Sequence, residues 1–249
     1  FSKSLFSNLD VAYPQNKETK VFLKKLGCKK IKKIGNLKFT NRNKKLNNFF
    51  NYNNIVNKKI LCASSTHYNE ELIIAKLHSR LEKKLKNLLT IIIPRHTDRC
   101  KKKIKSINKL NLPIQLHSEN KKIKKNTKIY LVDSYGETEK FFKISKVVFL
   151  GGSLINHGGQ NPLEAARLGC KIIHGKYIQN FKEIYSLLRN NKQSIKINSQ
   201  YDLDYIVKKS LNDRNKSSIF LQKLNKIGKV ILEDTNREII KLIQSKNAN

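Results

Sequence analysis

The sequence predicts an α/β fold built on a doubly wound parallel sheet, and three observations support it. From Ile60 onward, short apolar segments alternate with segments of helical periodicity. The most apolar segment, Leu88–Ile93, is β-branched at its centre and stops at Pro94, as a strand buried on both faces does. Polar and glycine-rich motifs follow several apolar segments. Because ligands of such sheets bind outside the carboxyl ends of the strands, we expect the functional residues to gather at one edge.

The individual elements follow from hydrophobic periodicity and from the residues that interrupt it. Apolar runs predict strands over Ile60–Ala63, Leu88–Ile93, Pro113–Leu116, Lys128–Val132, Lys146–Leu150, Lys171–Ile173 and Ser194–Ile197. Apolar residues at helical spacing predict helices over Glu70–Asn87, Cys100–Leu110, Glu137–Ile144, Asn161–Leu168 and Phe181–Arg189, then from Tyr201 and over 217–245. A strand followed by a helix returns parallel to its neighbour, which gives a parallel sheet with helices on both faces.

The chain is strongly basic, with 52 Lys and Arg against 18 Asp and Glu and a net charge of +34. Most of this charge is Lys spread over predicted helices and loops, which is typical of a solvated surface. The positive field also favours an anionic partner, such as a membrane surface or an acidic substrate. The sequence lacks a recognised nucleic-acid motif, so we expect no nucleic-acid partner. No apolar run approaches the roughly 18 residues that a transmembrane helix needs.

The cysteine and methionine counts bound the class of protein further. Four Cys stand far apart without a Cys-x-x-Cys pair, so the sequence predicts neither a disulfide scaffold nor a Cys-based zinc site. There is no Met at all, even at position 1. We therefore expect the chain to be a piece of a longer protein, whose preceding part would hold a targeting segment, an anchor or catalytic residues.

Hydroxyl groups end the first predicted strand, and basic side chains follow the second. Ser64 and Thr66 precede a helix start, where hydroxyls either cap the helix or face a ligand. The loop 94–99 then brings Arg95, His96 and Arg99 directly after the most apolar strand. Arg binds planar carboxylates and phosphates in a bidentate manner, whereas Asp98 in the same loop would neutralise one Arg as a surface pair. We expect at least one of the two Arg to bind an anion.

The strongest motif is a glycine-rich loop after the strand 146–150. It begins with Gly151-Gly152-Ser153 and, four residues later, continues as His157-Gly158-Gly159-Gln160-Asn161-Pro162-Leu163-Glu164. Glycines let a backbone approach a ligand closely, and exposed N–H groups at a helix N-terminus hold phosphate. Glu164 would reach a ribose diol or form a capping box with Asn161. We therefore expect phosphate binding here, although the Walker pattern is absent.

A weaker motif, Asp133-Ser134-Tyr135-Gly136-Glu137, follows another predicted strand. Gly136 permits a tight turn, and Glu137 opens a helix, where the dipole favours a carboxylate. This pattern gains meaning only in combination with the other motifs at the strand ends.

Taken together, these motifs resemble the 3-deoxy-D-manno-octulosonic acid (Kdo) transferases of lipopolysaccharide assembly. The matching segments are Gly35-Asn36-Leu37-Lys38-Phe39, 63–67 with Glu70-Glu71, 94–96 with Arg99, Gly136-Glu137, 151–153, Gly158-Gly159 with 161–164, and Gln179-Asn180-Phe181. The sequence departs from the family pattern at Thr97, Asp98, Gln160 and Ala165, where the family usually has Pro, Glu, His and Pro. The order and spacing of the segments match over roughly residues 1–190, which makes the combination specific although no single motif is.

The resemblance implies a GT-B glycosyltransferase with two Rossmann-like domains. Residues 1–40 would be the end of the N-terminal acceptor domain and the interdomain crossing, and residues 41–249 the C-terminal nucleotide-sugar donor-binding domain with C-terminal helices. The family transfers Kdo from CMP-Kdo to a lipid A precursor at the cytoplasmic face of the bacterial inner membrane, without a metal or another cofactor. Its general base lies in the N-terminal domain, so we expect no catalytic residue in this chain.

The motifs and the resemblance together assign a donor site. We expect CMP-Kdo to be bound by Ser64, Thr66, Arg95, His96, Arg99, Gly136, Glu137, Gly151, Gly152, Ser153, Gly158, Gly159, Asn161 and Glu164. Glu164 would hold the ribose hydroxyls, and Arg95, Arg99 or a nearby Lys would pair with the phosphate or with the sugar carboxylate. We expect the chain by itself to bind donor without catalysing transfer.

Two other functions fit the same composition. Another GT-B enzyme would use a UDP-sugar, and a preference for CMP over UMP or UDP distinguishes the Kdo transferase from it. A non-enzymatic basic module would bind nucleic acid or anionic lipid, with salt-sensitive affinity for polyanions and no preference for a mononucleotide. The glycine and Arg motifs have no role in such a module, so we rank it last.

Overall fold

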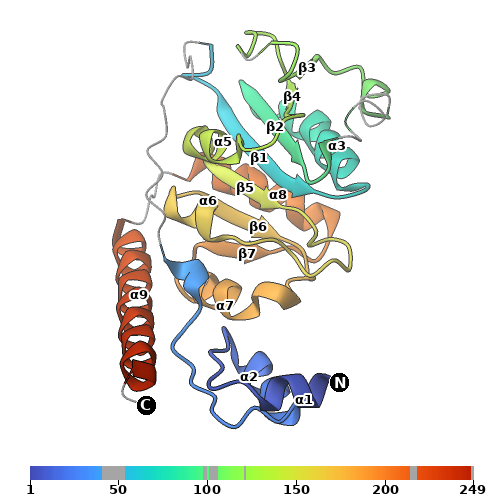
Figure 1. Ribbon diagram of the computed structural model, residues 1–249. Coiled ribbons are helices and arrows are strands. Elements are labelled where there is room, and N and C mark those ends of the chain that lie inside the picture. Colours follow the sequence, from blue (N-terminus) through green and yellow to red (C-terminus); the bar gives the residue numbers. More distant parts are fainter. Residues whose placement is uncertain (41–53, 98–99, 101–105, 121, 214–217, 248–249) are drawn as a thin grey trace. The chain divides into compact units, whose positions relative to one another are not determined.

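The computed structural model describes residues 1–40, 54–97, 100, 106–120, 122–213 and 218–247 (Figure 1). The chain divides into two compact units. One consists of residues 1–46 with 218–249, and the other of residues 47–217. The second unit contains the sheet, and all the candidate site residues fall within its limits.

The second unit is built on one sheet of seven parallel strands, in the order β3-β4-β2-β1-β5-β6-β7. The strands are β1 (Lys59–Thr66), β2 (Leu88–Pro94), β3 (Ile114–Leu116), β4 (Ile129–Leu131), β5 (Val147–Leu150), β6 (Lys171–His174) and β7 (Ser194–Lys196). Each overlaps a strand predicted from the sequence. Crossovers leave β1 on both sides, which is the topology of a doubly wound sheet, so the predicted fold class is confirmed.

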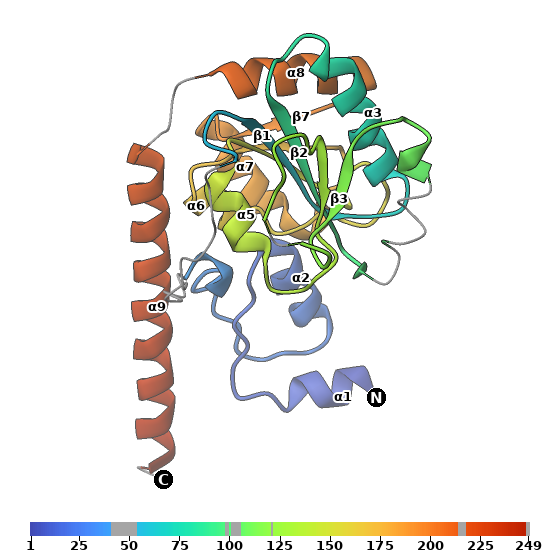
Figure 2. The same cartoon turned by 90° about the horizontal axis from the view of Figure 1, so that it is seen from above.

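Helices cover both faces of this sheet. They are α3 (Glu70–Glu82), α5 (Thr138–Ile144), α6 (Leu163–Arg167), α7 (Lys182–Asn190) and α8 (Gln200–Asn212), with a 3-10 turn, η3, at Gln179–Phe181. Figure 2 shows α3 and α8 together on one face, and both pack against β1. On the opposite face, Phe141 of α5 packs against Tyr130 of β4, with ring centroids 5.8 Å apart.

Two helix boundaries differ from the prediction. Helix α3 ends at Glu82 rather than at Asn87, and Asn87 itself has a φ of +62°, which is outside the helical range. Helix α6 begins at Leu163, after Pro162 as N-cap, and is therefore shorter than predicted. The helix predicted over Cys100–Leu110 lies partly outside the described residues.

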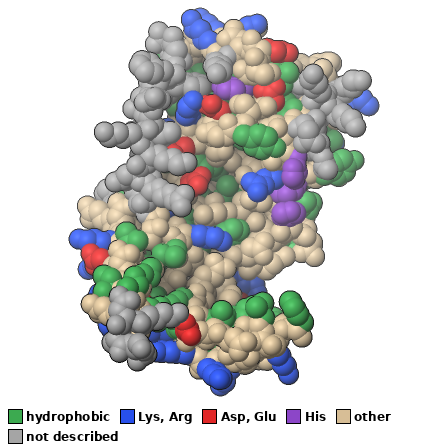
Figure 3. Space-filling view, viewed as in Figure 1, with side chains coloured by type: hydrophobic (Ala, Val, Ile, Leu, Met, Phe, Trp, Pro, Cys, Tyr) green, Lys and Arg blue, Asp and Glu red, His purple; other side chains and the backbone are tan. Residues whose placement is uncertain are grey.

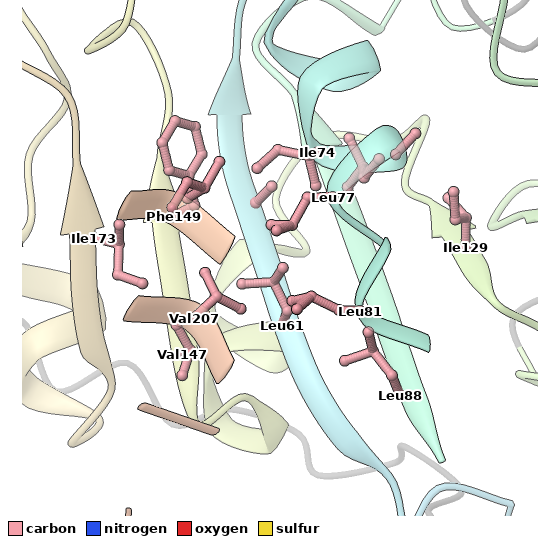
Figure 4. Close-up of a cluster of buried hydrophobic side chains, with 14 of the residues drawn as sticks. Leu61, Ile74, Leu77, Leu81, Leu88, Ile129, Val147, Phe149, Ile173 and Val207 are labelled. Carbon is pink, nitrogen blue, oxygen red and sulfur yellow. The ribbon is translucent and has the colours of Figure 1, made fainter. Parts of the chain in front are cut away.

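A hydrophobic core lies between the sheet and the pair of helices α3 and α8 (Figure 4). Leu61 of β1 and Val147 of β5 contribute to it from the centre of the sheet, and Leu77 and Val207 from the two helices. All four side chains are fully buried, and burying one of this size contributes about 1.5–3 kcal/mol. The core therefore holds β1 and β5 side by side and fixes the starting points of the loops that follow them.

The first unit joins the two ends of the chain. It contains α1 (Ser2–Ser7), α2 (Lys17–Lys25), a 3-10 turn, η1, at Leu37–Phe39, and the long helix α9 (Ser218–Asn247). Helix α9 packs against η1 so closely that a Cβ on Gly228 would lie 2.1 Å from the carbonyl oxygen of Phe39. Lys32 forms an ion pair with Glu238 of the same helix.

The division of the chain differs from the predicted domains in the position of its last helix. The predicted boundary at residue 40 lies near the observed division, but α9 groups with residues 1–46 and not with the sheet. Hydrophobic periodicity identifies a helix without revealing its distant partner, and so the sequence placed α9 with the donor domain. The functional assignment of the two units to acceptor and donor domains stays a prediction. Within the described part of the chain, no helix has the length and hydrophobicity of a membrane span.

Candidate functional site

The carboxyl ends of β1 and β5 mark the point where the connections of the sheet diverge. These strands are neighbours, with Ser64 opposite Leu150. The chain leaves β1 toward β2 on one side and leaves β5 toward β6 on the other. Doubly wound sheets bind their ligands outside such a switch point. The predicted residues of both loops, from Ser64 to Thr66 and from Gly151 to Ser153, lie here.

Strand β1 ends in a bulge at Ser65. Its φ is +53°, and the pairing of β1 with β2 shifts between Ser64 and Thr66. Both flanking hydroxyls are 1% exposed, and within the described residues neither Ser64 Oγ nor Thr66 Oγ1 has a hydrogen-bond partner. Neither caps α3, whose N-cap is Asn69 without a side-chain hydrogen bond. The capping alternative for these hydroxyls is therefore wrong. Two buried oxygen atoms at the end of β1 lack a hydrogen-bond partner among the described residues.

Close packing against other parts of the chain explains most glycines of the loop. A Cβ on Gly151 would lie 2.4 Å from the carbonyl oxygen of Ser65. A Cβ on Gly158 would lie 2.2 Å from the side-chain nitrogen of Asn180, and the same atom on Gly159 would lie 3.0 Å from the Tyr177 carbonyl oxygen. The protein thus needs these glycines for its own fold, whether or not a ligand also approaches them.

A buried carboxylate, Glu70, occupies the N–H groups of the glycine loop. It accepts hydrogen bonds from the backbone nitrogens of Gly152 at 2.7 Å, Ser153 at 3.2 Å and Leu154 at 3.0 Å. It also accepts one from the backbone nitrogen of His67 at 2.9 Å. The sequence motif predicts that these N–H groups hold a phosphate of the ligand. In the structure an internal carboxylate takes that place, which corrects the predicted role of the loop N–H groups.

The hydroxyl of Ser153 is also used within the fold. It is fully buried, donates to the carbonyl oxygen of Leu150 at 2.5 Å and accepts from the nitrogen of Gly175 at 2.9 Å. These bonds tie the loop after β5 to the end of β6. Ser153 therefore helps to fix the shape of the loop. Contact between its hydroxyl and a nucleotide-sugar donor stays a prediction.

Basic and imidazole side chains gather beside the bulge. Arg95 is exposed, and its backbone nitrogen donates to the Thr66 carbonyl oxygen at 2.9 Å. The ring centroid of His67 lies 6.2 Å from that of His96 and 4.0 Å from that of His157. Figure 3 shows histidine side chains grouped on the molecular surface. Three loops thus meet here, and Arg99, the other predicted arginine, lies outside the described residues.

The loop after β4 holds the weaker predicted pair, Gly136 and Glu137. Gly136 has a φ of +84°, and a Cβ there would meet nothing within 4 Å. The carboxylate of Glu137 forms an ion pair with Lys140 at 2.7 Å, within the first turn of α5. Strand β2 separates β4 from β1, so this pair lies farther from the switch point than the other predicted residues.

The end of the glycine loop presents a second carboxylate at the start of α6. Asn161 accepts a hydrogen bond from the backbone nitrogen of Leu163 at 3.2 Å, close to its predicted capping role. Glu164 is exposed, and the helix has no side-chain hydrogen bond at its N-cap, so the capping-box alternative is wrong. Burial lowers the pKa of Arg167, and the nearby Glu164 carboxylate opposes that shift. Glu164 therefore faces solvent with acceptor atoms available to a ligand.

Sequence reasoning missed two parts of this arrangement. Glu70 was recognised only as part of a motif, because a sequence does not show that a helix-opening carboxylate reaches loop N–H groups more than 80 positions away. His67 and His157 were not included in the site, since single histidines are common in any fold. The available signal was that each histidine follows the end of a strand within a few residues, His67 after β1 and His157 after β5.

The fold is that of a domain of a GT-B type glycosyltransferase. The solved C-terminal CMP-Kdo binding domain of WaaA from Acinetobacter baumannii has a similar structure, with a TM-score of 0.61 and 26% sequence identity. The match covers 72% of this chain and 91% of that domain. No protein-family model matches the chain.

The chain is also similar in sequence to curated proteins. The chain is 33% identical over 158 residues to the 3-deoxy-D-manno-octulosonic acid transferase of Haemophilus influenzae, covering 63% of this chain and 37% of that protein. It is 28% identical over 218 residues to the enzyme of the same name in Rickettsia bellii, covering 86% and 52%. The chain thus spans about a third to a half of these relatives. It is a relative of the Kdo transferases, which confirms the resemblance drawn from the motifs.

Proposed function

We propose that this chain is the donor-binding part of a glycosyltransferase that moves Kdo from CMP-Kdo to a lipid A precursor during lipopolysaccharide core biosynthesis. The similarity to a solved CMP-Kdo binding domain carries the proposal, because it spans 91% of that domain. The predicted donor-binding residues of β1, β2 and β5 support it, since they meet at the switch point of the sheet.

The chemistry of the donor matches the side chains at this edge. CMP-Kdo carries a phosphate and a sugar carboxylate, and the guanidinium of Arg95 can pair with either anion. Glu70 already holds the loop N–H groups, so we place the donor phosphate on side-chain cations rather than on that loop. Glu164 offers acceptors to the ribose hydroxyls, and the buried hydroxyls of Ser64 and Thr66 have no hydrogen-bond partner among the described residues.

Transfer breaks the bond between the anomeric carbon of Kdo and a phosphate oxygen of CMP. Negative charge develops on the departing phosphate, where a fixed cation stabilises the transition state. The acceptor hydroxyl forms the new bond and gives its proton to a base, which we place outside this chain. We propose that cationic side chains serve the leaving group without a metal ion. Equal CMP affinities in EDTA and in magnesium would support this.

The acceptor and the location form the second part of the proposal. A lipid A precursor is phosphorylated and sits in an anionic membrane, so a chain with a net charge of +34 is attracted to its surface. Each Lys near such a surface contributes about 1 kcal/mol. We propose that the protein works at the cytoplasmic face of the inner membrane. Co-sedimentation with anionic vesicles but not with neutral ones tests this.

Calorimetric titration of the chain with CMP, with UMP as the control, tests the donor assignment. Saturable binding that prefers CMP supports a cytidine-nucleotide donor site. A preference for UMP favours the enzyme class that uses UDP-sugars, and salt-sensitive binding to polyanions without mononucleotide binding favours the basic binding module. A circular dichroism spectrum of the same sample shows whether an absence of binding reflects an unfolded chain.

A further inference from the structure

We propose that Glu70 is a positioning residue of the donor site, which locks the glycine loop against the end of β1 and does not touch the donor. This inference rests on the proposed function, because it names how the site of that function is held in shape. The interaction between Glu70 and the loop can also be measured without any ligand. An experiment can therefore refute this inference and the proposed function separately.

The geometry of the carboxylate is the first argument. Glu70 is 0% exposed, and its two oxygens share four backbone N–H donors equally. Oε2 accepts from His67 and Gly152, and Oε1 accepts from Ser153 and Leu154. All four distances lie between 2.7 and 3.2 Å. The oxygens thus bridge the loop after β1 and the loop after β5.

The charge of Glu70 is the second argument. Among the described residues its carboxylate forms no ion pair, although basic residues abound in the chain. Converging backbone N–H groups stabilise a buried anion by their partial positive charges. Conversely, these N–H groups need an acceptor, since a buried donor left unpaired costs about 1–3 kcal/mol. The loop and the carboxylate therefore satisfy each other.

The place of this bridge in the sheet is the third argument. The two loops flank the switch point, and the residues proposed to meet the donor continue directly from them. The ring centroids of His67 and His157 lie 4.0 Å apart, and a Cβ on Gly152 would be 3.2 Å from the His67 ring. A loop released from Glu70 would displace these contacts. The carboxylate therefore positions the loop residues that surround the nucleotide-sugar donor, without contacting the donor itself.

Glu70→Gln is the sharpest variant, because an amide has one acceptor oxygen where the carboxylate has two. Whichever way the amide is turned, two of the four N–H groups then face an NH2 group. We expect CMP affinity to fall about tenfold or more, as for lost hydrogen bonds to a charged group. We also expect the amide NMR signals of Gly152, Ser153 and Leu154 to move and to exchange faster with solvent.

Glu82→Gln is the matched control, since it makes the same change at the other end of the same helix. Glu82 pairs with Lys128 at 3.3 Å and is the last residue of α3, whereas Glu70 is the first. We expect it to leave CMP affinity and the loop amide signals unchanged. Acetate added to Glu70→Ala should fill the vacated space and restore part of both, which a loss of general stability would not allow.

Each outcome decides the proposal. Wild-type CMP affinity and unmoved loop signals in Glu70→Gln would overturn it. Should the wild-type chain bind no CMP, the proposed function fails, and the loop signals of Glu70→Gln still decide whether the carboxylate locks the loop. Should Glu70→Gln not fold, wild-type chain titrated with CMP decides: small shifts at 152–154 support the lock, and a 31P coupling across those amides would show that phosphate replaces Glu70.

Discussion

The backbone of Gly151 lies directly against that of Ser65, which leaves no room for a side chain at position 151. A Cβ on Gly151 would lie 2.4 Å from the carbonyl oxygen of Ser65 and 2.5 Å from the Cα of Thr66. Ser65 itself has a φ of +53° and forms the bulge that ends β1. Such strained backbone persists only where neighbouring structure determines it. The bulge at Ser65 therefore requires glycine at position 151.

Gly151→Ala should destabilise the protein by about 3 kcal/mol, at the upper end of what overpacking costs, because backbone atoms cannot yield to the new methyl group. Urea unfolding followed by circular dichroism measures this. Gly169→Ala is the control: it has a φ of +76° and nothing within 4 Å of a new Cβ, so strain should cost only about 1 kcal/mol. Equal losses in the two variants would contradict the tight contact.

Glu164→Gln should weaken CMP binding by about 1–3 kcal/mol, as for a lost charge-assisted hydrogen bond to the ribose. Its stability should stay unchanged, because the carboxylate is exposed and does not cap α6. Calorimetry with CMP and with 2′-deoxy-CMP checks the contact, since the variant should discriminate between them less. Glu119→Gln, in an exposed loop, is the control, and an unaltered affinity of Glu164→Gln would remove this residue from the site.

Arg95→Ala should identify the anion that this arginine binds. If the guanidinium pairs with the phosphate, the variant should lose about tenfold affinity for CMP while binding cytidine as before. If it pairs with the sugar carboxylate, CMP affinity should be kept and only CMP-Kdo affinity should fall. Arg189→Ala, on α7, provides a control for the loss of one positive charge. Normal affinity for both CMP and CMP-Kdo would exclude Arg95 from the donor site.

Two buried histidines should make the protein less stable in mild acid. Burial and, to a smaller extent, neighbouring cations lower the pKa of His174 and of His78 to about 4. The unfolded chain, with a histidine pKa near ~6.5, takes up protons first as the pH falls. This stabilisation is complete above about pH 6.5 and is lost progressively down to about pH 4, at most about 3 kcal/mol for each histidine.

Urea midpoints measured between pH 7 and pH 4.5 test that dependence. His174→Asn should flatten the curve, because it removes one of the two titrating groups. His96→Asn, at an exposed histidine, is the control for the substitution itself. A slope that is the same in all three proteins would show that His174 does not contribute.

The sequence predicted the sheet well because its strands are apolar runs ended by turn residues. Leu88–Ile93 needed only its composition to be placed as a central strand, and β2 confirmed it. The bulge at Ser65 escaped prediction, since nothing in Ser-Ser-Thr signals a positive φ. Helix α9 was predicted as a helix, while its packing against η1 depends on contacts across the length of the chain.

The sequence predicted which residues lie at the candidate site, but not which acceptor bonds to the N–H groups of the glycine loop. Glycines near a strand end were expected to cradle a phosphate, because that is what exposed N–H groups do. The competing principle is that buried N–H groups take any acceptor the fold supplies, and here Glu70 supplies it. A sequence motif shows which loop is special and leaves open which partner satisfies it.

The central position of β1 also determines when both edges of this strand can be paired during synthesis. Leu61 pairs with Val147, so β1 gains its second neighbour only after β2, β3 and β4 have been made. Pairings this distant along the chain form slowly and leave a strand edge exposed in the meantime. A dense positive charge keeps such unfinished chains apart. The arrival of β5 then pairs the second edge of β1 and brings the following loop to Glu70, and β6 and β7 extend the sheet afterwards.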